Sequence, residues 1–326
     1  MAAYLGIDVA KATLDVTLLD QDGKLQHKQF VNRSQGFAAL ATWLSQRSRE
    51  PGHQAVHVCL EATGTYSYAL AAYLFEAGYR VSVVNPHRIQ AFAKSQLSRN
   101  KTDKQDATLI ARFCASQHPE TWTPPPAHRR ELQSLVRHLE ALSEMRQQQS
   151  NRLEVQPVAT VQSSLAALVA YLDAEIERIK AQLQEHIQKH AELRHQQALL
   201  TSIPGIGELT AAKLLAEIEH LTTYKNARQA AAYAGLTPRQ HQSGTSVRGQ
   251  TRLSKTGNAR ARKALYFPAM VALRFNPIIR ALAERLRKRH KNSMVIVGAA
   301  MRKLLHLAYG VLKTGQPFDP QYATTS

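Results

Sequence analysis

Residues 4–31 read YLGIDVAKATLDVTLLDQDGKLQHKQFV, and this stretch decides the fold of the first third of the chain. Tyr4–Asp8 is a short apolar strand, and Thr13–Leu19 alternates in the manner of a second strand. Asp22-Gly23 is a hairpin signal that leads into a third strand ending near Val31. Three consecutive strands joined by short turns are therefore expected.

Helical and strand patterns then alternate as far as residue 116. Ser34 can cap a helix that runs to Arg47, and the patterns continue with a strand at Ala55–Leu60, a helix at Thr65–Ala77 and a strand at Arg80–Val84. Two further helices are expected at Arg88–Ser95 and Asp103–Ser116. Three strands followed by alternating helix and strand is the order of an RNase H-like α/β fold.

Four carboxylates fall where this fold would bring them together. Asp8 ends the first strand and Glu61 ends the fourth, so they meet at one sheet edge if these strands are neighbours. Asp103 and Asp106 are three residues apart, on one face of a helix. Four such groups can hold two divalent cations for phosphoryl transfer, and Mg²⁺ suits hard oxygen ligands.

Each of these signals is weak by itself. An Asp at a strand end usually forms a turn, and a pair of Asp residues at a helix start usually complements the helix dipole. Asp15 and Asp20 are assigned to those structural roles. The convergence of four acids on one expected edge is what favours a metal site.

The middle of the chain predicts a helical hairpin. Thr123-Pro124-Pro125-Pro126 is a stiff linker, and two long amphipathic helices follow near His128–Leu153 and Ser163–Leu193, with a break at Pro157. The second helix has a nearly straight apolar stripe, made of Leu165, Leu168, Leu172, Ile176, Ile179, Leu183, Ile187 and His190. An antiparallel coiled-coil hairpin is expected, which either pairs with another subunit or packs only on its own domain.

The charge of the chain is strongly positive and unevenly placed. There are 42 Lys and Arg against 24 Asp and Glu, a formal net charge of +18. No acid lies from His220 to Ala283, where eleven Lys or Arg occur, and Glu284 is the only acid between His220 and Phe318. A solvated basic face explains surplus cations, but not this absence of acids. Nucleic acid is therefore the expected partner.

Other classes of protein fit the sequence less well. No apolar run approaches the roughly 20 residues of a spanning helix, and the start MAAYLGIDVA lacks the regions of a signal peptide. Cys59 and Cys114 have apolar neighbours, which predicts buried thiols rather than a disulfide or zinc framework. A cytoplasmic protein with no membrane partner is expected.

A glycine-rich turn opens the carboxy-terminal region. Ile203-Pro204-Gly205-Ile206-Gly207 precedes a helix at Leu209–Ile218 and has the pattern of a helix-hairpin-helix turn. In such a turn, Gly205 and Gly207 let backbone N–H groups approach a phosphate without reading bases. A helix turn with no ligand is the alternative, and the basic setting favours contact with a nucleic-acid backbone.

A glycine-flanked serine lies farther on among arginines. Gly235-Leu236-Thr237-Pro238-Arg239 is followed by Gln242-Ser243-Gly244-Thr245-Ser246 and then by Arg248 and Arg252. A Ser-Gly pair alone is merely a turn, and serine is a poor nucleophile until a base or cation assists it. The arginines can stabilise phosphorane-like charge, whereas a base or metal must come from another domain or subunit.

These motifs resemble those of the DEDD-type insertion-sequence transposases, the Piv-like family, over nearly the whole chain. The resemblance rests on residues 6–11, 60–64, 84–86 and 101–107 and on the carboxy-terminal motifs just described. It implies a RuvC-like domain at 1–122, a helical coiled-coil hairpin at 127–195 and an all-α domain with a helix-hairpin-helix turn at 196–326.

The resemblance also implies the chemistry. Asp8, Glu61, Asp103 and Asp106 would bind Mg²⁺ at the DNA phosphate, and Ser243 would be the catalytic nucleophile that forms a 5′-phosphoserine intermediate. A structured bridge RNA would pair with double-stranded donor and target DNA, and dimers would join into a tetramer on the bacterial nucleoid. The residues assigned to nucleic-acid binding are Lys101, Lys104, Gly205, Gly207, Arg239, Arg248, Arg252 and Lys255.

Two other functions remain open from the residues alone. A metal-dependent junction-resolving endonuclease would use the four acids and would not need Ser243. A non-catalytic architectural DNA-binding protein would need neither. A strand-exchange assay separates the three, because they give recombined product, hydrolytic nicks only, or no covalent change.

Overall fold

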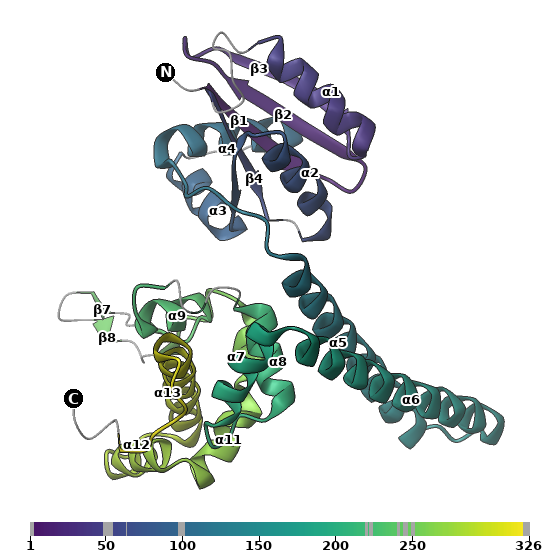
Figure 1. The fold of residues 1–326 in the computed structure, drawn as a ribbon, viewed down its shortest axis with the longest axis vertical. Helices are drawn as coiled ribbons and strands as arrows, with labels where there is room; N and C mark the ends of the chain where they lie inside the picture. Colours follow the sequence, from purple (N-terminus) through teal and green to yellow (C-terminus); the bar gives the residue numbers. More distant parts are fainter. Residues whose placement is uncertain are drawn as a thin grey trace. The chain divides into compact units, whose positions relative to one another are not determined.

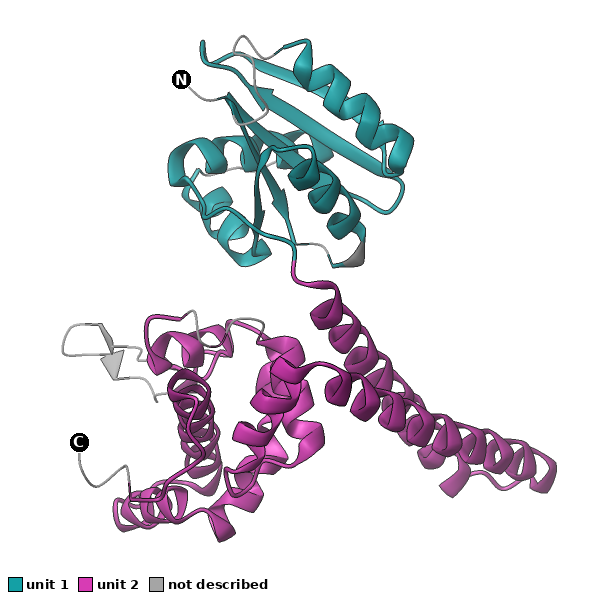
Figure 2. Cartoon of the chain, in the orientation of Figure 1, with its two compact units in different colours: residues 1–124 teal, residues 125–326 magenta. Residues whose placement is uncertain are grey.

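The computed structural model describes residues 3–47, 55–62, 64–96, 102–218, 221, 224–239, 242–243, 247–248 and 252–321. The chain forms two compact units, residues 1–124 and residues 125–326 (Figures 1 and 2). The division of the second unit into a hairpin and a separate domain stays a prediction. Within the second unit, polar contacts join the hairpin to the helices that follow it: Gln133 of the hairpin donates to the carbonyl oxygen of Ala216 at 3.0 Å.

A five-stranded sheet forms the centre of the first unit, in the order β3-β2-β1-β4-β5. The strands are β1 (Ala3–Val9), β2 (Thr13–Leu19), β3 (Leu25–Val31), β4 (Val56–Glu61) and β5 (Arg80–Val84). β2 pairs antiparallel with β1 and β3, whereas β4 pairs parallel with β1 and β5. The predicted RNase H-like order is confirmed, and β1 and β4 are neighbours.

Helices cover both faces of this sheet (Figure 1). Phe37 of α1 (Ser34–Ser45) and Leu70 of α2 (Thr65–Glu76) belong to one apolar cluster with the sheet. On the other face, α3 (Pro86–Ser95) and α4 (Asp103–Gln117) pack in a second cluster that contains Cys59 and Cys114. Both cysteines are buried and free, as predicted.

The close approach of α4 to β1 depends on one glycine. A Cβ atom at Gly6 would lie 2.2 Å from the carbonyl oxygen of Ala107 and 2.2 Å from the nitrogen of Ala111. Any side chain there would push the helix away from the strand. The absence of a side chain at Gly6 therefore fixes the distance between the strand that carries Asp8 and the helix that begins at Asp103.

The second unit begins with a hairpin of two long helices, α5 (Ala127–Glu154) and α6 (Ala159–Lys189). Six of the eight predicted stripe residues of α6 are buried. Leu168 is an exception at 42% exposed, because it lies at the edge of the stripe. The predicted helix also ends early, since His190 has an extended backbone, with φ −108° and ψ 106°.

Shorter helices complete this unit. They are α7 (Ala191–Thr201), α8 (Glu208–Glu217), α9 (Ala227–Tyr233), α10 (Ala259–Ala264), α11 (Tyr266–Phe275), α12 (Pro277–Lys288) and α13 (Ser293–Thr314). The expectation of an all-α domain was wrong in one respect. Two short ribbons are present: β6 (Pro238–Arg239) pairs with β9 (Arg252–Leu253), and β7 (Gln242–Ser243) pairs with β8 (Val247–Arg248).

Helix α13 is long and apolar enough to cross a membrane by length and composition, with a mean hydropathy of 1.4 in its most apolar window. The sequence expectation concerned unbroken apolar runs, and Arg302 and Lys303 interrupt the apolar sequence of α13. In that window, 56% is buried inside the protein. The physical reason is that α13 packs against α7, α9, α11 and α12, so several of its sides must be apolar.

Candidate active site

Asp8 and Glu61 lie side by side at the carboxyl ends of β1 and β4. Successive residues of a strand face opposite sides of the sheet, so Asp8 faces the α4 side together with Gly6. Leu60 of β4 pairs with Ile7 of β1 in the parallel register, so the next residues on the two strands, Glu61 and Asp8, lie beside each other. The predicted meeting of these two acids at one sheet edge is confirmed.

Asp103 and Asp106 occupy the first turn of α4. The hydroxyl oxygen of Thr102 caps this helix by accepting the N–H group of Gln105 at 3.3 Å. The helix start carries partial positive charge from its backbone N–H groups, which stabilises carboxylates there. Because α4 lies on Gly6, this turn is brought to the end of β1 that carries Asp8.

Burial and neighbouring acids raise the pKa of Asp8. It is raised from 3.8 to about 6, first by burial and then by the negative charges of Asp106, Asp103, Glu61 and Asp15. A nearby like charge disfavours ionisation, so these carboxylates form one electrostatic cluster. As the side chains stand, the described residues contain no group of three His, Cys, Asp or Glu arranged to hold a metal ion. The oxygen donors suit a hard cation, which would also relieve their repulsion.

Asp15 is the acid that the sequence interpretation missed. It was assigned to a turn or a helix end, and this is wrong: it lies in mid-strand, directly across from Asp8, and is buried. Its Oδ2 accepts from Gln29 at 3.0 Å, and its Oδ1 lies 3.5 Å from His27 Nε2. The sequence signal that could have identified Asp15 was an acid inside a predicted strand, away from its ends. Asp20, in contrast, accepts two N–H groups in the predicted turn.

The residues assigned to nucleic-acid binding differ in exposure. Lys104 is exposed in the first turn of α4, whereas Lys101 lies outside the described residues. Gly205 has φ +108°, and a Cβ atom there would lie 2.7 Å from the Cβ of Ala272, so packing on α11 accounts for this glycine. Gly207 is the N-cap residue that precedes α8, and a Cβ atom there would meet nothing within 4 Å. Gly207 therefore fits an open turn better than Gly205 does.

Ser243 lies on a hairpin that is closed at its base. Its backbone pairs with Val247, and Arg239 pairs with Arg252 nearer the base. The side chains of Ser243 and Arg248 lie outside the described residues, as do Gly244, Thr245 and Ser246. Arg239, Arg252 and Lys255 are exposed. The predicted roles of this block stay predictions.

A network of hydrogen bonds holds the base of the β-hairpin that carries Ser243. Asn258 Nδ2 donates to Glu217 Oε2 at 3.2 Å, and Arg262 donates to the carbonyl oxygens of Ala234 and Lys255, each at 3.1 Å. Glu217 also accepts from Arg137 Nε of the helical hairpin at 3.0 Å. The sequence interpretation missed this network, although Glu217 and Glu219 are the last two acids before the acid-free stretch.

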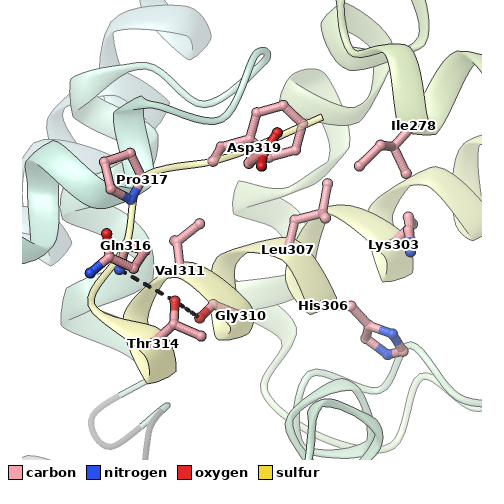
Figure 3. Close-up of a pocket in the computed structure, with 11 residues that line it drawn as sticks. Ile278, Lys303, His306, Leu307, Gly310, Val311, Thr314, Gln316, Pro317 and Asp319 are labelled. Carbon is pink, nitrogen blue, oxygen red and sulfur yellow. Dashed lines mark hydrogen bonds between the residues drawn. The ribbon is translucent and has the colours of Figure 1, made fainter. Parts of the chain in front are cut away.

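A pocket of about 850 Å³ lies elsewhere in the second unit, between α13 and residues 316–319 (Figure 3). Ile278 and Leu307 are among its apolar walls, and Lys303 and His306 also line it. Burial, followed by neighbouring cations, lowers the pKa of His306 to about 4. Among the described lining residues Asp319 is the only acid, so the pocket does not have the donor set of the carboxylate cluster.

The chain matches known transposases along most of its length. Residues 5–156 match a transposase model of the DEDD IS110 kind, and residues 197–284 match the model of the transposase IS116/IS110/IS902 family. A pilin gene-inverting protein of Moraxella bovis is 35% identical over 97% of each chain. The transposase for insertion sequence element IS1328 of Yersinia enterocolitica is 26% identical over 97% of this chain and 98% of that one.

A solved structure of T. thermophilus RuvC in complex with a Holliday junction substrate is also similar. It matches 37% of this chain and 99% of its own at 18% identity, with a TM-score of 0.26. The RNase H-like assignment therefore rests on the strand order itself.

Proposed function

The chain belongs to the IS116/IS110/IS902 family of transposases, and from this premise we propose that it cuts and rejoins donor and target DNA through a phosphoserine intermediate on Ser243. The observation that carries the proposal is the cluster at Asp8, whose pKa is raised by the charges of Asp103, Asp106 and Glu61. Crowded acids at the carboxyl ends of neighbouring strands are a poor way to stabilise a fold, and they suit the binding of a cation and a phosphate.

Asp8, Glu61, Asp103 and Asp106 would hold Mg²⁺ in this proposal. When bound, the cation would supply charge stabilisation at the DNA phosphate. The four carboxylates would supply the hard oxygen ligands, and the exposed ammonium group of Lys104 would contact the neighbouring phosphate backbone. These acids stand on the ends of two neighbouring strands and on one helix start, which are rigid elements that orient ligands well.

Ser243 would attack the scissile phosphate. A bond forms between its Oγ and phosphorus as the bond from phosphorus to the 3′ oxygen breaks. A base from another domain or subunit takes the serine hydroxyl proton and passes it to the departing 3′ oxygen. The free 3′ hydroxyl later reverses this exchange on a different strand and releases the serine. The exposed Arg239 and Arg252 support this role, because cations stabilise the charge that develops on phosphorus.

Guidance and assembly complete the proposal. A structured bridge RNA would pair with double-stranded donor and target DNA, and the basic second unit would contact the backbones of these nucleic acids. Gly207, at the open turn before α8, would present backbone N–H groups to a phosphate in the manner of a helix-hairpin-helix motif. The helical hairpin would pair as a coiled coil between subunits, supported by Tyr171 on α6, which is 65% exposed.

Trapping the covalent intermediate tests the mechanism. The full chain is incubated with a nicked suicide DNA substrate, guide RNA and MgCl₂, and the DNA-linked peptide is mapped by mass spectrometry. We expect the adduct on Ser243 and its loss in Ser243→Ala. Thr245→Ala and Ser246→Ala are the matched controls, and both should still form the adduct.

The same assay separates the rival functions. Hydrolytic nicks that persist in Ser243→Ala, without an adduct, would replace the recombinase by a metal-dependent junction nuclease. Asp8→Asn, Glu61→Gln, Asp103→Asn and Asp106→Asn should each abolish strand exchange in a folded protein. Full activity in any one of them, or activity in the presence of a chelator, would remove that residue or the metal from the site.

A further inference from the structure

The outer face of α11 exposes aromatic and aliphatic side chains. Phe267 is 75% exposed and Phe275 is 69% exposed. Met270 and Val271 are each close to half exposed. These four residues share one face of the helix, because their spacing of three, four and eight positions follows the helical repeat. Four exposed apolar side chains gathered on one helix face, in contrast to single scattered ones, indicate a binding surface.

The opposite face of α11 is fully used in packing. Ala269 and Ala272 are buried, and a Cβ atom at Gly205 would lie 2.7 Å from the Cβ of Ala272. Asn276, the buried residue that ends α11 and caps α12, donates to the carbonyl oxygen of Pro204 at 3.3 Å. The helix is thus held in place by its inner face. The ring of Phe267 has an aromatic neighbour, Tyr266, whose ring centroid lies 5.4 Å away in an edge-to-face arrangement, and this contact leaves Phe267 75% exposed.

A run of exposed cations begins at the same corner and follows α12. Its members are Arg280, Arg285, Arg287, Lys288, Arg289 and Lys291. Within the part of the chain that the structure describes, none of the six makes an ion pair, and Glu284 is the one acid among them. On the helical hairpin, in contrast, Arg146 pairs with Asp173.

The helix dipole accounts for only part of this run. Cations in the last turn of α12 are stabilised by the negative end of the dipole, which explains Arg285, Arg287 and Lys288. Arg280 lies near the start of the helix, where the dipole opposes a positive charge. Six unpaired like charges also repel one another, and a polyanion would relieve that repulsion.

We propose that the α11–α12 corner binds a single-stranded polynucleotide. Its phosphates contact the cations of α12, and its bases stack on Phe275 and Phe267. A duplex would satisfy the cations but not the rings, because its bases are already stacked on one another. Single strands of DNA and of RNA share this chemistry, since every base has a π-face. The surface lies outside the carboxylate cluster and does not involve Ser243. The inference rests on the proposed contact of the basic second unit with nucleic acid and is independent of the serine mechanism.

Fluorescence anisotropy with the full chain tests the stacking. The probes are labelled oligothymidylate, oligouridylate and a DNA duplex of equal length. Phe275→Leu keeps apolar bulk but removes the π-face, and it should weaken binding of both single strands about tenfold. Phe275→Trp should retain binding. Duplex affinity should stay unchanged in both variants.

Salt titrations test the cations. In Arg285→Gln combined with Arg287→Gln, the slope of log affinity against log salt for single strands should fall by about 0.7 for each lost phosphate contact. Lys180→Gln is the matched control, because this exposed lysine already pairs with Glu177 on the hairpin, and its slope should match that of the unmodified protein.

Three results would overturn the proposal: single-strand affinity unchanged in Phe275→Leu, duplex affinity reduced equally, or a change of oligomeric state in light scattering that assigns the face to a second copy of the chain. Equal binding of the two single strands would support readout of base faces alone, and tighter binding of oligouridylate would support RNA as the occupant. Ser243→Ala should bind single strands normally, so a failure of the serine mechanism would leave this result standing.

Discussion

Asp8 in the first unit and Glu217 in the second are both carboxylates withdrawn from water, but their neighbours differ in charge. Glu217 is 4% exposed, accepts from Arg137 and Asn258, and has Arg260 at 3.9 Å. Asp8 is surrounded by other acids, which raise its pKa to about 6. A buried acid among donors holds a structure together, whereas one among acids costs stability and points to a function that needs the charge.

Removing the Glu217 side chain should have the largest effect. Glu217→Ala removes the buried carboxylate that accepts from both Arg137 and Asn258, and Asn258 keeps only the backbone carbonyl of residue 217, so the free energy of unfolding should fall by about 3 kcal/mol. Chemical denaturation of the full chain measures this. Asp173→Ala, which breaks the half-exposed pair with Arg146, is the control and should cost less than about 1 kcal/mol. Equal losses in the two variants would mean that burial of Glu217 does not matter.

Adding one methyl group at Gly6 should come next. In Gly6→Ala the new Cβ meets backbone atoms of Ala107 and Ala111, so α4 must move, at a cost of about 2 kcal/mol. Strand exchange should be lost as well, because the first turn of α4 moves away from Asp8. Gly310→Ala in α13 is the control, since its Cβ meets nothing within 4 Å. An active, stable Gly6→Ala protein would refute the role of this contact.

Removing the charge of Asp8 should stabilise the protein while abolishing strand exchange. The pKa in the folded state, about 6, lies above the ordinary 3.8, so the folded protein binds this proton more tightly than the unfolded chain does. The favourable contribution of Asp8 to the free energy of unfolding is therefore fully present below pH 3.8 and is lost as the pH rises through 6.

Asp8→Asn should consequently raise the unfolding free energy by about 1–2 kcal/mol at neutral pH, after allowance for solvent screening, and by almost nothing near pH 4. Melting temperatures across this pH range, measured without divalent cations, give the comparison. A gain that is the same at every pH would assign the effect to something other than the charge of Asp8.

Magnesium should give the smallest effect. If Asp8 and its neighbours hold Mg²⁺, MgCl₂ at ten times its dissociation constant stabilises the folded protein by about 1.4 kcal/mol. Asp8→Asn should lose most of this gain, and Glu217→Ala should keep it despite its lower starting stability. Differential scanning calorimetry measures both. A gain retained in Asp8→Asn would place the cation elsewhere.

The succession of the five strands along the chain, and the places of Asp8 and Glu61 at strand ends and of Asp103 and Asp106 at a helix start, could be predicted from the sequence alone. Hairpin signals, alternation and helix caps act over a few residues, so they are visible in sequence, as Asp22-Gly23 and Thr102 illustrate. The exposure of Leu168 could not be predicted. The apolar stripe of α6 is visible in the sequence, but which edge of that stripe the partner helix covers is not. The short ribbons around Ser243 were likewise missed, since strands of two residues carry no period.

The local sequence pattern by itself determined the helices and most strands of this protein, its basic second unit and the candidate acids. The tertiary structure alone decided that Asp15 lies across from Asp8, that Gly6 admits α4, and that Glu217 joins the helical hairpin to the base of the serine-bearing loop. Each of these contacts joins residues on different elements. Such contacts depend on strand register and packing distance, and neither quantity is encoded within a single stretch of sequence.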